Sequence, residues 1–259
     1  MRRAFSRVVL TGGAGHLGRA ILRSNLFPGL LAPSHQELDI TDARSVQKYF
    51  KEHKPEAVIH TAAIARMSQC EKDPITALKT NLVGTANLVE EVLAQKKSKG
   101  QPIRFVYISS DGVYESTQGR YSEKDATVPY NKYGWTKLGG ECAVNLLPDF
   151  CIIRTRFYDP ERLEYDSYAT DSFTSSVSVN YLVQAIKILL GSDFCGTINV
   201  GGKRSSDYDL YRKLGPKVKA CRLRDYNQKP PMRLSVDSSL NLSLWQKILR
   251  KSKTKIRLA

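Results

Sequence analysis

Short apolar runs alternate with longer amphipathic segments from the start of the chain to Phe157. The apolar runs have the length of buried strands, and they occur at 8–10, 30–32, 56–65, 103–110 and 150–157. The segments between them have the periodicity of helices. Because strands that alternate with helices form parallel sheets covered on both faces, the pattern predicts a doubly wound α/β (Rossmann) domain.

The segment 73–95 illustrates how the sequence marks a helix. Asp73 is the expected N-cap and Pro74 occupies the first turn. One apolar stripe follows at helical spacing, made of Ile75, Leu78, Leu82, Ala86, Val89 and Leu93. In the same way, Thr41 is the expected N-cap of a helix in 38–55, and we expect the helix around 131–140 to stop at Pro148.

The pattern loosens after Phe157. The segment 158–176 is polar and irregular, a helix and a short strand are predicted within 179–202, and the residues from Lys203 onward are basic and weakly periodic. We therefore expect residues 1–157, with 179–202, to form the dinucleotide-binding domain. The remainder of 158–259 would form a smaller C-terminal substrate-binding lobe.

Charge and cysteine content narrow the class of protein. The formal net charge of +15 suggests a nucleic-acid partner, but no aromatic-rich binding motif accompanies it. We favour a pocket for a polyanionic ligand and expect no specific nucleic-acid binding. Five scattered cysteines without a CxxC predict neither a disulfide framework nor a metal site. No apolar run is long enough for a membrane span or a signal peptide, so we expect the cytoplasm.

A glycine-rich stretch, TGGAGHLG, follows the first predicted strand and opens a helix. Glycines at this junction let the backbone approach a pyrophosphate, and the helix N-terminus offers unpaired N–H groups. The stretch therefore predicts a dinucleotide site that contains Gly12, Gly15, His16, Leu17 and Gly18.

The end of the second predicted strand bears on the choice of dinucleotide. An NAD site usually has a carboxylate there, on the ribose 2′-hydroxyl. Here the strand is followed by Pro33, Ser34 and His35, and the first carboxylate is Glu37. Ser34 and His35 would accept a 2′-phosphate, so the sequence favours NADP (NADPH) over NAD.

Tyr133 and Lys137 lie one helical turn apart within NKYGWTKLGG. An ammonium near a phenol lowers the pKa of the phenol, which would make Tyr133 a tuned proton donor. Tyrosine and lysine are also common on solvated helix faces, so the spacing alone leaves both readings open. The small glycines around the pair would leave room for a cofactor beside the helix.

The chain resembles the dTDP-4-dehydrorhamnose reductase family within the extended short-chain dehydrogenase/reductase superfamily. The resemblance is carried by TGGAGHLG, LDITD, KPEAVIHTAAIARMSQCEKDP, ISSDGVY, PYNKYGWTKLGGE, IIRTRFY and DSSLN, which span almost the whole chain. It implies reduction of a nucleotide-linked 4-keto-6-deoxy sugar, as in deoxysugar biosynthesis, and a homodimer built through helices 74–95 and 131–147.

The resemblance also implies roles for individual residues. Tyr133 would protonate the substrate carbonyl, Lys137 would hold the nicotinamide ribose, and Ser110 would hydrogen-bond the carbonyl oxygen. Further cofactor contacts would come from Asp39, Ile40, Ala62, Ala63 and Asn81, although Asn81 also suits a helix residue packed on the sheet. Substrate contacts would come from Asp111, Phe157, Arg66 and Arg233. The family commonly has Trp at the position of Phe157, and acids such as Asp159 and Asp166 are unusual.

Two reactions of related enzymes are excluded because the side chains that they need are absent from the sequence. Gly112 follows Asp111, so the acid pair of the 4,6-dehydratases is absent. All four histidines precede residue 61, so an epimerase-reductase that needs a distant histidine lacks its acid. A nucleotide-sugar epimerase that recycles NAD and an NADP-binding regulatory subunit without turnover remain alternatives. Arg66, Arg156 and Arg233 suit surface charge as well as a diphosphate clamp.

Overall fold

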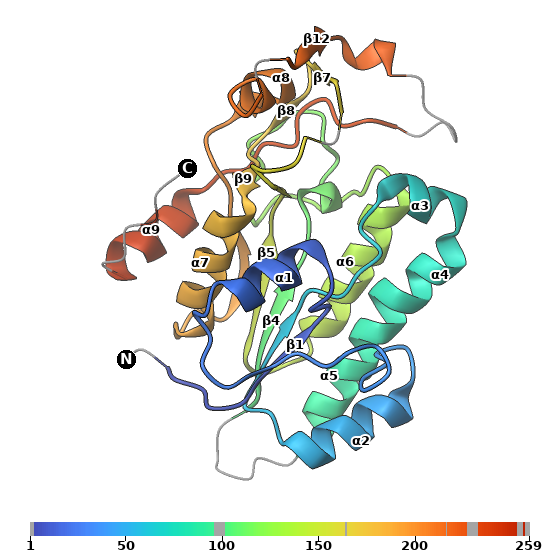
Figure 1. The fold of residues 1–259 in the computed structure, drawn as a ribbon, viewed down its shortest axis with the longest axis vertical. Coiled ribbons are helices and arrows are strands. Elements are labelled where there is room, and N and C mark those ends of the chain that lie inside the picture. Colours follow the sequence, from blue (N-terminus) through green and yellow to red (C-terminus); the bar gives the residue numbers. More distant parts are fainter. Residues whose placement is uncertain are drawn as a thin grey trace.

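The computed structural model describes residues 3–95, 102–163, 165–215, 217–226, 233–252 and 256. Its centre is a parallel sheet of six strands in the order β10-β5-β4-β3-β1-β2 (Figure 1). The strands are β1 Val8–Thr11, β2 Leu30–Leu31, β3 Ala57–His60, β4 Arg104–Ile108, β5 Phe150–Arg154 and β10 Gly196–Asn199. The predicted fold class is confirmed, and the strand expected within 179–202 is β10, next to β5.

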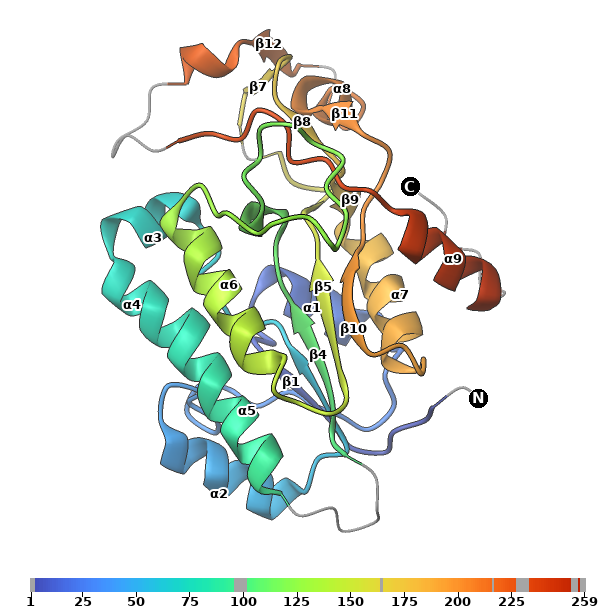
Figure 2. The same cartoon turned by 180° about the vertical axis from the view of Figure 1, so that it is seen from behind.

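Helices cover both faces of the sheet, as its two-sided hydrophobicity requires. One face carries α1 (His16–Arg23), α7 (Val179–Leu190) and α9 (Ser243–Ser252). The other carries α2 (Ala43–His53), α5 (Gly84–Ala94) and α6 (Lys132–Val144), as Figures 1 and 2 show. Successive strand residues alternate between the two cores: Val8 and Leu10 pack on one face and Val9 on the other.

The helix expected at 73–95 contains a π-helical turn. It consists of α4 (Pro74–Leu78), the π-helical residues Lys79–Val83 and α5, and the Asp73 carboxylate caps it by accepting a hydrogen bond from the Thr76 N–H. The apolar stripe is divided, because Val89 is buried while the side chains of Ile75, Leu78 and Leu93 are exposed. Within α5 the core face is made of Leu88, Val89 and Val92, so of the stripe residues only Val89 belongs to the buried core.

Two predicted helix ends are wrong. The N-cap of α2 is Asp42, whose carboxylate accepts from the Arg44 N–H, while the Thr41 hydroxyl bonds to Asp39 instead. A carboxylate one residue later competes better for the first-turn N–H groups. At its other end, α6 stops at Val144 before reaching Pro148, because residues 145–147 form tighter turns.

Short elements lie beyond the carboxyl ends of the sheet strands (Figures 1 and 2). They pair as β6 (Phe157–Tyr158) with β9 (Val177–Ser178), β7 (Ser167–Ala169) with β12 (Lys219–Cys221), and β8 (Phe173–Thr174) with β11 (Ser205–Ser206). The helices α3 (Met67–Lys72) and α8 (Asp207–Tyr211) and two 3₁₀ turns, Asp111–Val113 and Leu223–Asp225, complete the described elements. Among the helices described, none has the length and apolarity needed to cross a membrane.

A buried histidine joins the first and third strands beneath the carboxyl edge. His60 Nδ1 lies 2.6 Å from the Thr11 hydroxyl, and Nε2 lies 2.9 Å from the Thr85 hydroxyl. The Thr85 hydroxyl donates its own proton to the Asn81 carbonyl, so it accepts from Nε2–H and Nδ1 accepts from Thr11. Burial lowers the pKa of His60 to about 3, which keeps the ring neutral.

We predict that His60 makes the fold acid-sensitive. In the unfolded chain the ring binds a proton near its ordinary pKa of 6.5, whereas the native ring resists protonation down to about 3. As the pH is lowered below 6.5, the free energy of unfolding should therefore decrease, and His60 should contribute up to about 1.4 kcal/mol of this decrease per pH unit. Urea unfolding between about pH 6 and pH 5 should show a steeper loss in the wild type than in His60→Gln, and equal slopes would contradict the prediction.

Candidate functional site

The glycine stretch lies where the sheet order reverses. The chain leaves β1 toward β2 on one side and returns as β3 on the other, so the carboxyl ends of β1 and β3 form the switch point at which doubly wound sheets bind ligands in a crevice. Gly12 has a φ of +78°, and a Cβ there would lie 2.6 Å from the Ala62 N. Both the backbone conformation and the close approach to Ala62 require glycine. The structure thus brings the predicted loop next to Ala62.

The start of α1 offers backbone N–H groups toward this crevice. Gly15 is the N-cap and supplies no side-chain acceptor. A side chain on Gly18 would collide with the Gly12 carbonyl, so Gly18 lets the helix lie against the loop. Leu17 is buried in the core, so only its backbone can face a ligand.

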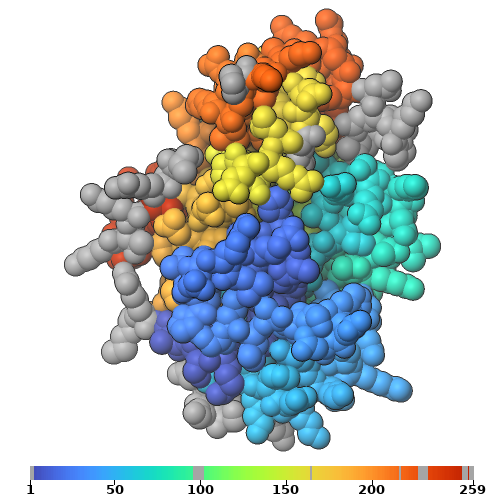
Figure 3. Space-filling view, viewed as in Figure 1, coloured from blue at the N-terminus to red at the C-terminus, as the bar shows by residue number. Residues whose placement is uncertain are grey.

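His16 is held by the segment that follows β6. Its Nε2 lies 2.5 Å from an Asp159 carboxylate oxygen. The hydrogen bond with His16 is the main cause that lowers the pKa of Asp159. Figure 3 shows this segment, in yellow, directly over the start of α1, in blue. One of the unusual acids of the sequence therefore reaches the predicted cofactor loop.

The residues after β2 form an exposed turn. The Glu37 carboxylate folds back to accept a hydrogen bond from the Ser34 N–H at 2.7 Å, and the His35 side chain is largely exposed, 3.9 Å from an Asp39 oxygen. The Ile40 side chain is buried against Gly84. The Glu37 carboxylate therefore lies beside Ser34, although β2 itself is not followed directly by an acidic residue.

Ser110, Asp111 and Tyr133 come together at the end of β4. The Ser110 hydroxyl lies 3.2 Å from Asp111 Oδ1 and accepts a hydrogen bond from the Gly112 N–H. Burial is the main cause that raises the pKa of Tyr133 above its ordinary value, and the Asp111 carboxylate adds to it. Hydrogen bonding with Ser110 acts in the opposite direction. The serine and tyrosine predicted for catalysis are thus neighbours.

Lys137 lies one turn further along α6, but the expected tuning of Tyr133 by Lys137 is not found. The Lys137 ammonium lies 4.0 Å from the centre of the Tyr107 ring, and it is not among the groups that shift the pKa of Tyr133. Burial lowers the pKa of Lys137 itself to about 7, with Glu141 opposing this. Tyr133 is therefore a weak acid that keeps its proton.

The glycines of α6 face protein rather than open space, which corrects a further expectation. A Cβ on Gly139 would meet the Leu82 side chain, one on Gly140 the Tyr107 hydroxyl, and one on Gly134 the Gly112 carbonyl. These glycines let α6 pack closely on its neighbours. They do not leave room for a cofactor.

Asn81 is fully engaged within the π-helical turn. Its side chain accepts from the Ile64 N–H and donates to the Ile64 carbonyl and to the Thr136 hydroxyl, at 2.8, 3.0 and 2.9 Å. The amide therefore fastens the segment after β3 to α6. Of the two roles considered for Asn81, these contacts support packing. Ala63 directly precedes Ile64, whose backbone Asn81 holds.

The structure brings only some of the predicted substrate-binding residues close to Tyr133. Asp111 is beside Tyr133, and Phe157 is half-buried at the start of β6. Arg66 is exposed at the N-cap of α3, and Arg233 is exposed and lies 3.6 Å from Glu115. No motif in the sequence marks Asp207, and Arg156 suited surface charge as well as a diphosphate clamp. Both act electrostatically at Asp111.

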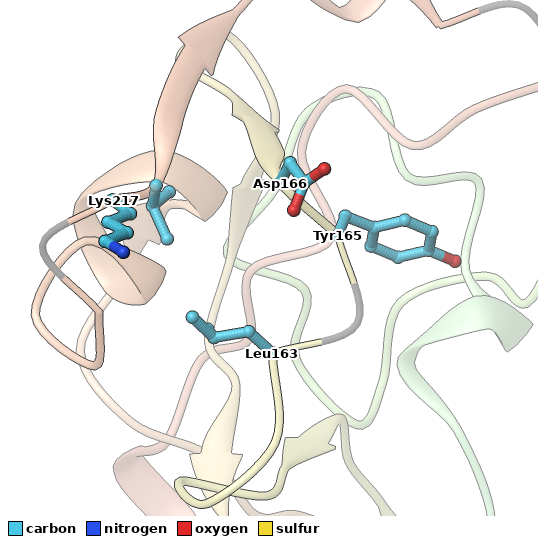
Figure 4. Close-up of a pocket in the computed structure, with 5 residues that line it drawn as sticks. Leu163, Tyr165, Asp166 and Lys217 are labelled. Atoms are coloured by element: carbon cyan, nitrogen blue, oxygen red, sulfur yellow. The ribbon is translucent and has the colours of Figure 1, made fainter.

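A separate cavity of about 320 Å³ lies beside the paired strands β7 and β12, among the short elements beyond the sheet (Figure 4). Leu163, Tyr165 and Asp166 line it from one segment, and Lys217 and Val218 line it from another. None of these five residues is one of the predicted catalytic or cofactor residues. The chemistry of the chain is therefore better sought at Ser110 and Tyr133 than in this cavity.

The fold, the glycine crevice and the Ser110–Tyr133–Lys137 arrangement define a Rossmann-type protein of the extended short-chain dehydrogenase/reductase kind. Residues 6–162, more than half of the chain, match the model of the RmlD substrate binding domain family, and the chain belongs to that family.

Individual relatives agree with this assignment. A dTDP-4-keto-6-deoxy-D-glucose reductase of Streptomyces niveus is 38% identical over 155 residues, which are 58% of this chain and 51% of the relative. Methionine adenosyltransferase 2 subunit beta of Rattus norvegicus is 32% identical over 147 residues, 53% of this chain and 42% of that protein. The chain thus spans about half the length of the curated relatives it matches.

A similar solved structure covers nearly the whole chain. The crystal structure of a dTDP-4-dehydrorhamnose reductase from Clostridium acetobutylicum superposes with a TM-score of 0.82 at 26% identity, over 96% of this chain and 94% of the other. The fold therefore extends beyond the region matched in sequence.

We predict that Gly12→Ala damages the crevice while Gly13→Ala does not. The first places a Cβ at positive φ against Ala62, whereas the nearest atom to a Cβ on Gly13 is the Ala32 Cβ at 3.4 Å, an ordinary contact. Gly12→Ala should cost about 2 kcal/mol and lower Tm by about 4–8 °C. Thermal melts and NADPH titrations test this, and equal behaviour of the two variants would refute it.

Proposed function

We propose that the chain reduces the C4 keto group of a nucleotide-linked 4-keto-6-deoxy sugar with NADPH. The observation that carries the proposal is the convergence of Ser110 and Tyr133 beside the glycine crevice, on one edge of the sheet. A hydride acceptor carbonyl needs hydrogen-bond donors at its oxygen and a dinucleotide alongside. The similarity to the Streptomyces niveus reductase supports the same reaction class.

Tyr133 and Ser110 are assigned to the carbonyl oxygen. A proton donor must hold its proton until negative charge develops on the substrate, and the raised pKa of Tyr133 satisfies this. Ser110 would donate a second hydrogen bond to the same oxygen. The carbon gains a hydride and the oxygen gains the phenolic proton, so the ketone becomes an alcohol.

The residues around the crevice fit a dinucleotide. Gly12 and Gly18 remove side chains from the loop, the start of α1 presents N–H groups, and Ala62 and Ala63 form the opposite wall. Lys137 is assigned to the nicotinamide ribose, and Asp39 with Ile40 to the adenine side. NADPH, when bound, would supply the hydride, and NAD is the alternative cofactor.

The substrate would bind between the sheet edge and the outer elements. We assign the dinucleotide-binding domain to residues 1–157 with 179–202, and the substrate-binding lobe to the rest of 158–259. Asp111, Phe157, Arg66 and Arg233 remain the proposed substrate contacts, the last two as candidates for the diphosphate.

A second candidate is a regulatory subunit that binds NADP without turnover. The similarity to methionine adenosyltransferase 2 subunit beta favours it. The Ser110–Tyr133 arrangement favours the reductase, because a subunit without turnover has no need of a proton donor. A nucleotide-sugar epimerase that recycles NAD would use the same Ser110, Tyr133 and Lys137, and the similarity to a reductase favours reduction over it.

Association is proposed on the outer face of α4 and α6. Ile75 and Leu78 of α4 and Trp135 of α6 expose 68%, 48% and 56% of their surface, an apolar set that suits a homodimer. Light scattering of the purified protein measures the oligomeric state.

We assign the net positive charge to ligand binding and solubility, and we propose that the protein works in the cytoplasm. Gel shifts should therefore show only salt-sensitive retention of nucleic acid.

The catalytic assignment predicts distinct effects of three substitutions. Tyr133→Phe should abolish reduction and leave NADPH binding nearly intact, because the hydroxyl acts in the transition state. Lys137→Met should weaken both, since Lys137 is assigned to the ribose. Ser110→Ala should lower turnover by a smaller factor, about 10²-fold. NADPH oxidation with a panel of nucleotide 4-keto-6-deoxy sugars gives the rates.

The same series separates the two candidates. The three effects should be non-additive, because the residues act on one oxygen. A Tyr133→Phe protein that reduces its substrate at nearly the wild-type rate would refute the assignment. NADPH binding without reduction of any sugar in the panel would favour the regulatory subunit.

The cofactor preference should depend on the charges after β2. Wild-type protein should bind NADPH more tightly than NADH, and Ser34→Asp should shift the preference toward NADH. Because Glu37 holds its carboxylate at the Ser34 N–H, Glu37→Gln should tighten NADPH binding by several-fold, with little change for NADH. Fluorescence titrations measure the six dissociation constants, and equal or tighter NADH binding by the wild type would overturn the preference.

A further inference from the structure

A group of charged side chains surrounds the proposed carbonyl site on its substrate side. Arg156, in the link between β5 and β6, lies with Nε 3.3 Å from Asp111 Oδ2. The side chain of Arg156 is 25% exposed and that of Asp111 is 4% exposed. Asp207, the first residue of α8, and Tyr130 also interact electrostatically with this guanidinium. The sequence analysis had left Arg156 as a surface or diphosphate-clamp residue.

The charges decide against a diphosphate clamp at Arg156. One guanidinium faces two carboxyl groups, so it brings no unbalanced positive charge to an anion. Asp111 is the main cause that raises the pKa of Arg156, and Asp207 adds to it, as expected for a cation already paired. The pair suits a neutral polar group of the substrate better than a phosphate.

Asp111 has an acceptor to offer such a group. Its Oδ1 is 3.2 Å from the Ser110 hydroxyl, whereas its buried Oδ2 faces Arg156 Nε at 3.3 Å and accepts no hydrogen bond of normal geometry from any described residue. Buried carboxylate oxygens are normally hydrogen-bonded, so an oxygen beside the reacting centre that has an ion-pair contact but no hydrogen bond points to a donor on the substrate. The described residues likewise give the Arg156 guanidinium a salt bridge to Asp111 alone.

We propose that Arg156 is a positioning residue that holds Asp111 to accept a hydrogen bond from the hydroxyl next to the reacting carbonyl. This rests on the proposed function. In a 4-keto-6-deoxy sugar the carbons that flank C4 are C3, which carries a hydroxyl, and C5, which carries the methyl group. The recognised group is therefore the C3 hydroxyl, and the site selects sugars that have it.

Arg156 contributes orientation as well as charge. Its planar guanidinium pairs with Asp111 and fixes the plane of the carboxylate, so that one oxygen faces the substrate. Lysine would supply the charge at a single point without fixing that plane. Because Arg156 follows β5 and Asp207 begins α8, the same guanidinium also lies between the sheet and the outer lobe.

The test compares two substrates with a set of variants. A nucleotide-linked 4-keto-6-deoxy sugar and its 3-deoxy analogue are reduced by the wild type, Arg156→Gln and Arg156→Lys. Arg212→Gln is the matched control, because Arg212 pairs with Asp209 on the exposed side of α8, 3.2 Å away. NADPH binding and thermal melts establish that each variant is folded.

The wild type should prefer the 3-hydroxy substrate by roughly 10- to 100-fold in kcat/KM, the scale of a hydrogen bond to a charged group. Arg156→Gln should lose most of this preference by losing rate on the 3-hydroxy substrate alone, Arg156→Lys should recover part of it, and Arg212→Gln should keep it all. A folded Arg156→Gln that keeps the full preference, or slows equally on both substrates, overturns the proposal.

Two further outcomes are distinguishable. If Arg156→Gln does not fold, Asp111→Asn/Arg156→Gln removes both charges of the Asp111–Arg156 pair, so that Asp111 is not left as a buried carboxylate without its cation. This double variant should reduce both substrates with similar kcat/KM, and a retained preference would overturn the proposal. If the wild type reduces neither substrate while binding NADPH, the proposed reductase function itself fails, and the role of Arg156 fails with it.

Discussion

The Glu141 carboxylate is the contact on which the position of α6 depends. It is buried between that helix and the sheet, where it accepts hydrogen bonds from the Ser109 hydroxyl and from two nitrogens of the Arg154 guanidinium. Removing one partner of such a pair costs about 3–5 kcal/mol, because the other charge stays buried. Since Ser109 follows β4 and Arg154 ends β5, the carboxylate fixes α6 against the edge at which the carbonyl would react.

The same carboxylate sets the charge of the site. Glu141 lies one turn beyond Lys137 and supports its positive charge, while burial opposes it, which brings the pKa of Lys137 to about 7. Tyr133 lies one turn before Lys137, and there burial and Asp111 act in the same direction, since both raise the pKa of the phenol. One helix therefore carries a cation that can lose its proton near neutral pH and a phenol that keeps its own, as proton donation to a ketone requires.

The parts of the structure that depend on local rules could be predicted from the sequence. The order of strands and helices, the Asp73 cap and the glycine loop follow from periodicity, capping and backbone freedom. The α6 glycines were misread, because only the fold shows that Leu82 and Tyr107 lie against them. The expectation that Lys137 tunes Tyr133 failed for a related reason. Helical spacing places two residues on one face, but the Tyr107 ring decides where the ammonium lies.

The two sides of the site differ in how they are encoded. The cofactor side is built from backbone geometry within short segments, so a motif such as the Gly12–Gly18 loop reveals it. The substrate side is built from charges far apart in sequence: Asp111, Arg156 and Asp207 meet only because β4, β5 and α8 converge. No spacing rule links these three residues, and each is unremarkable in its own stretch. A buried carboxylate oxygen needs a hydrogen bond as well as a counter-ion, however, so once the fold is known the Asp111 oxygen that lacks one identifies what the substrate must supply.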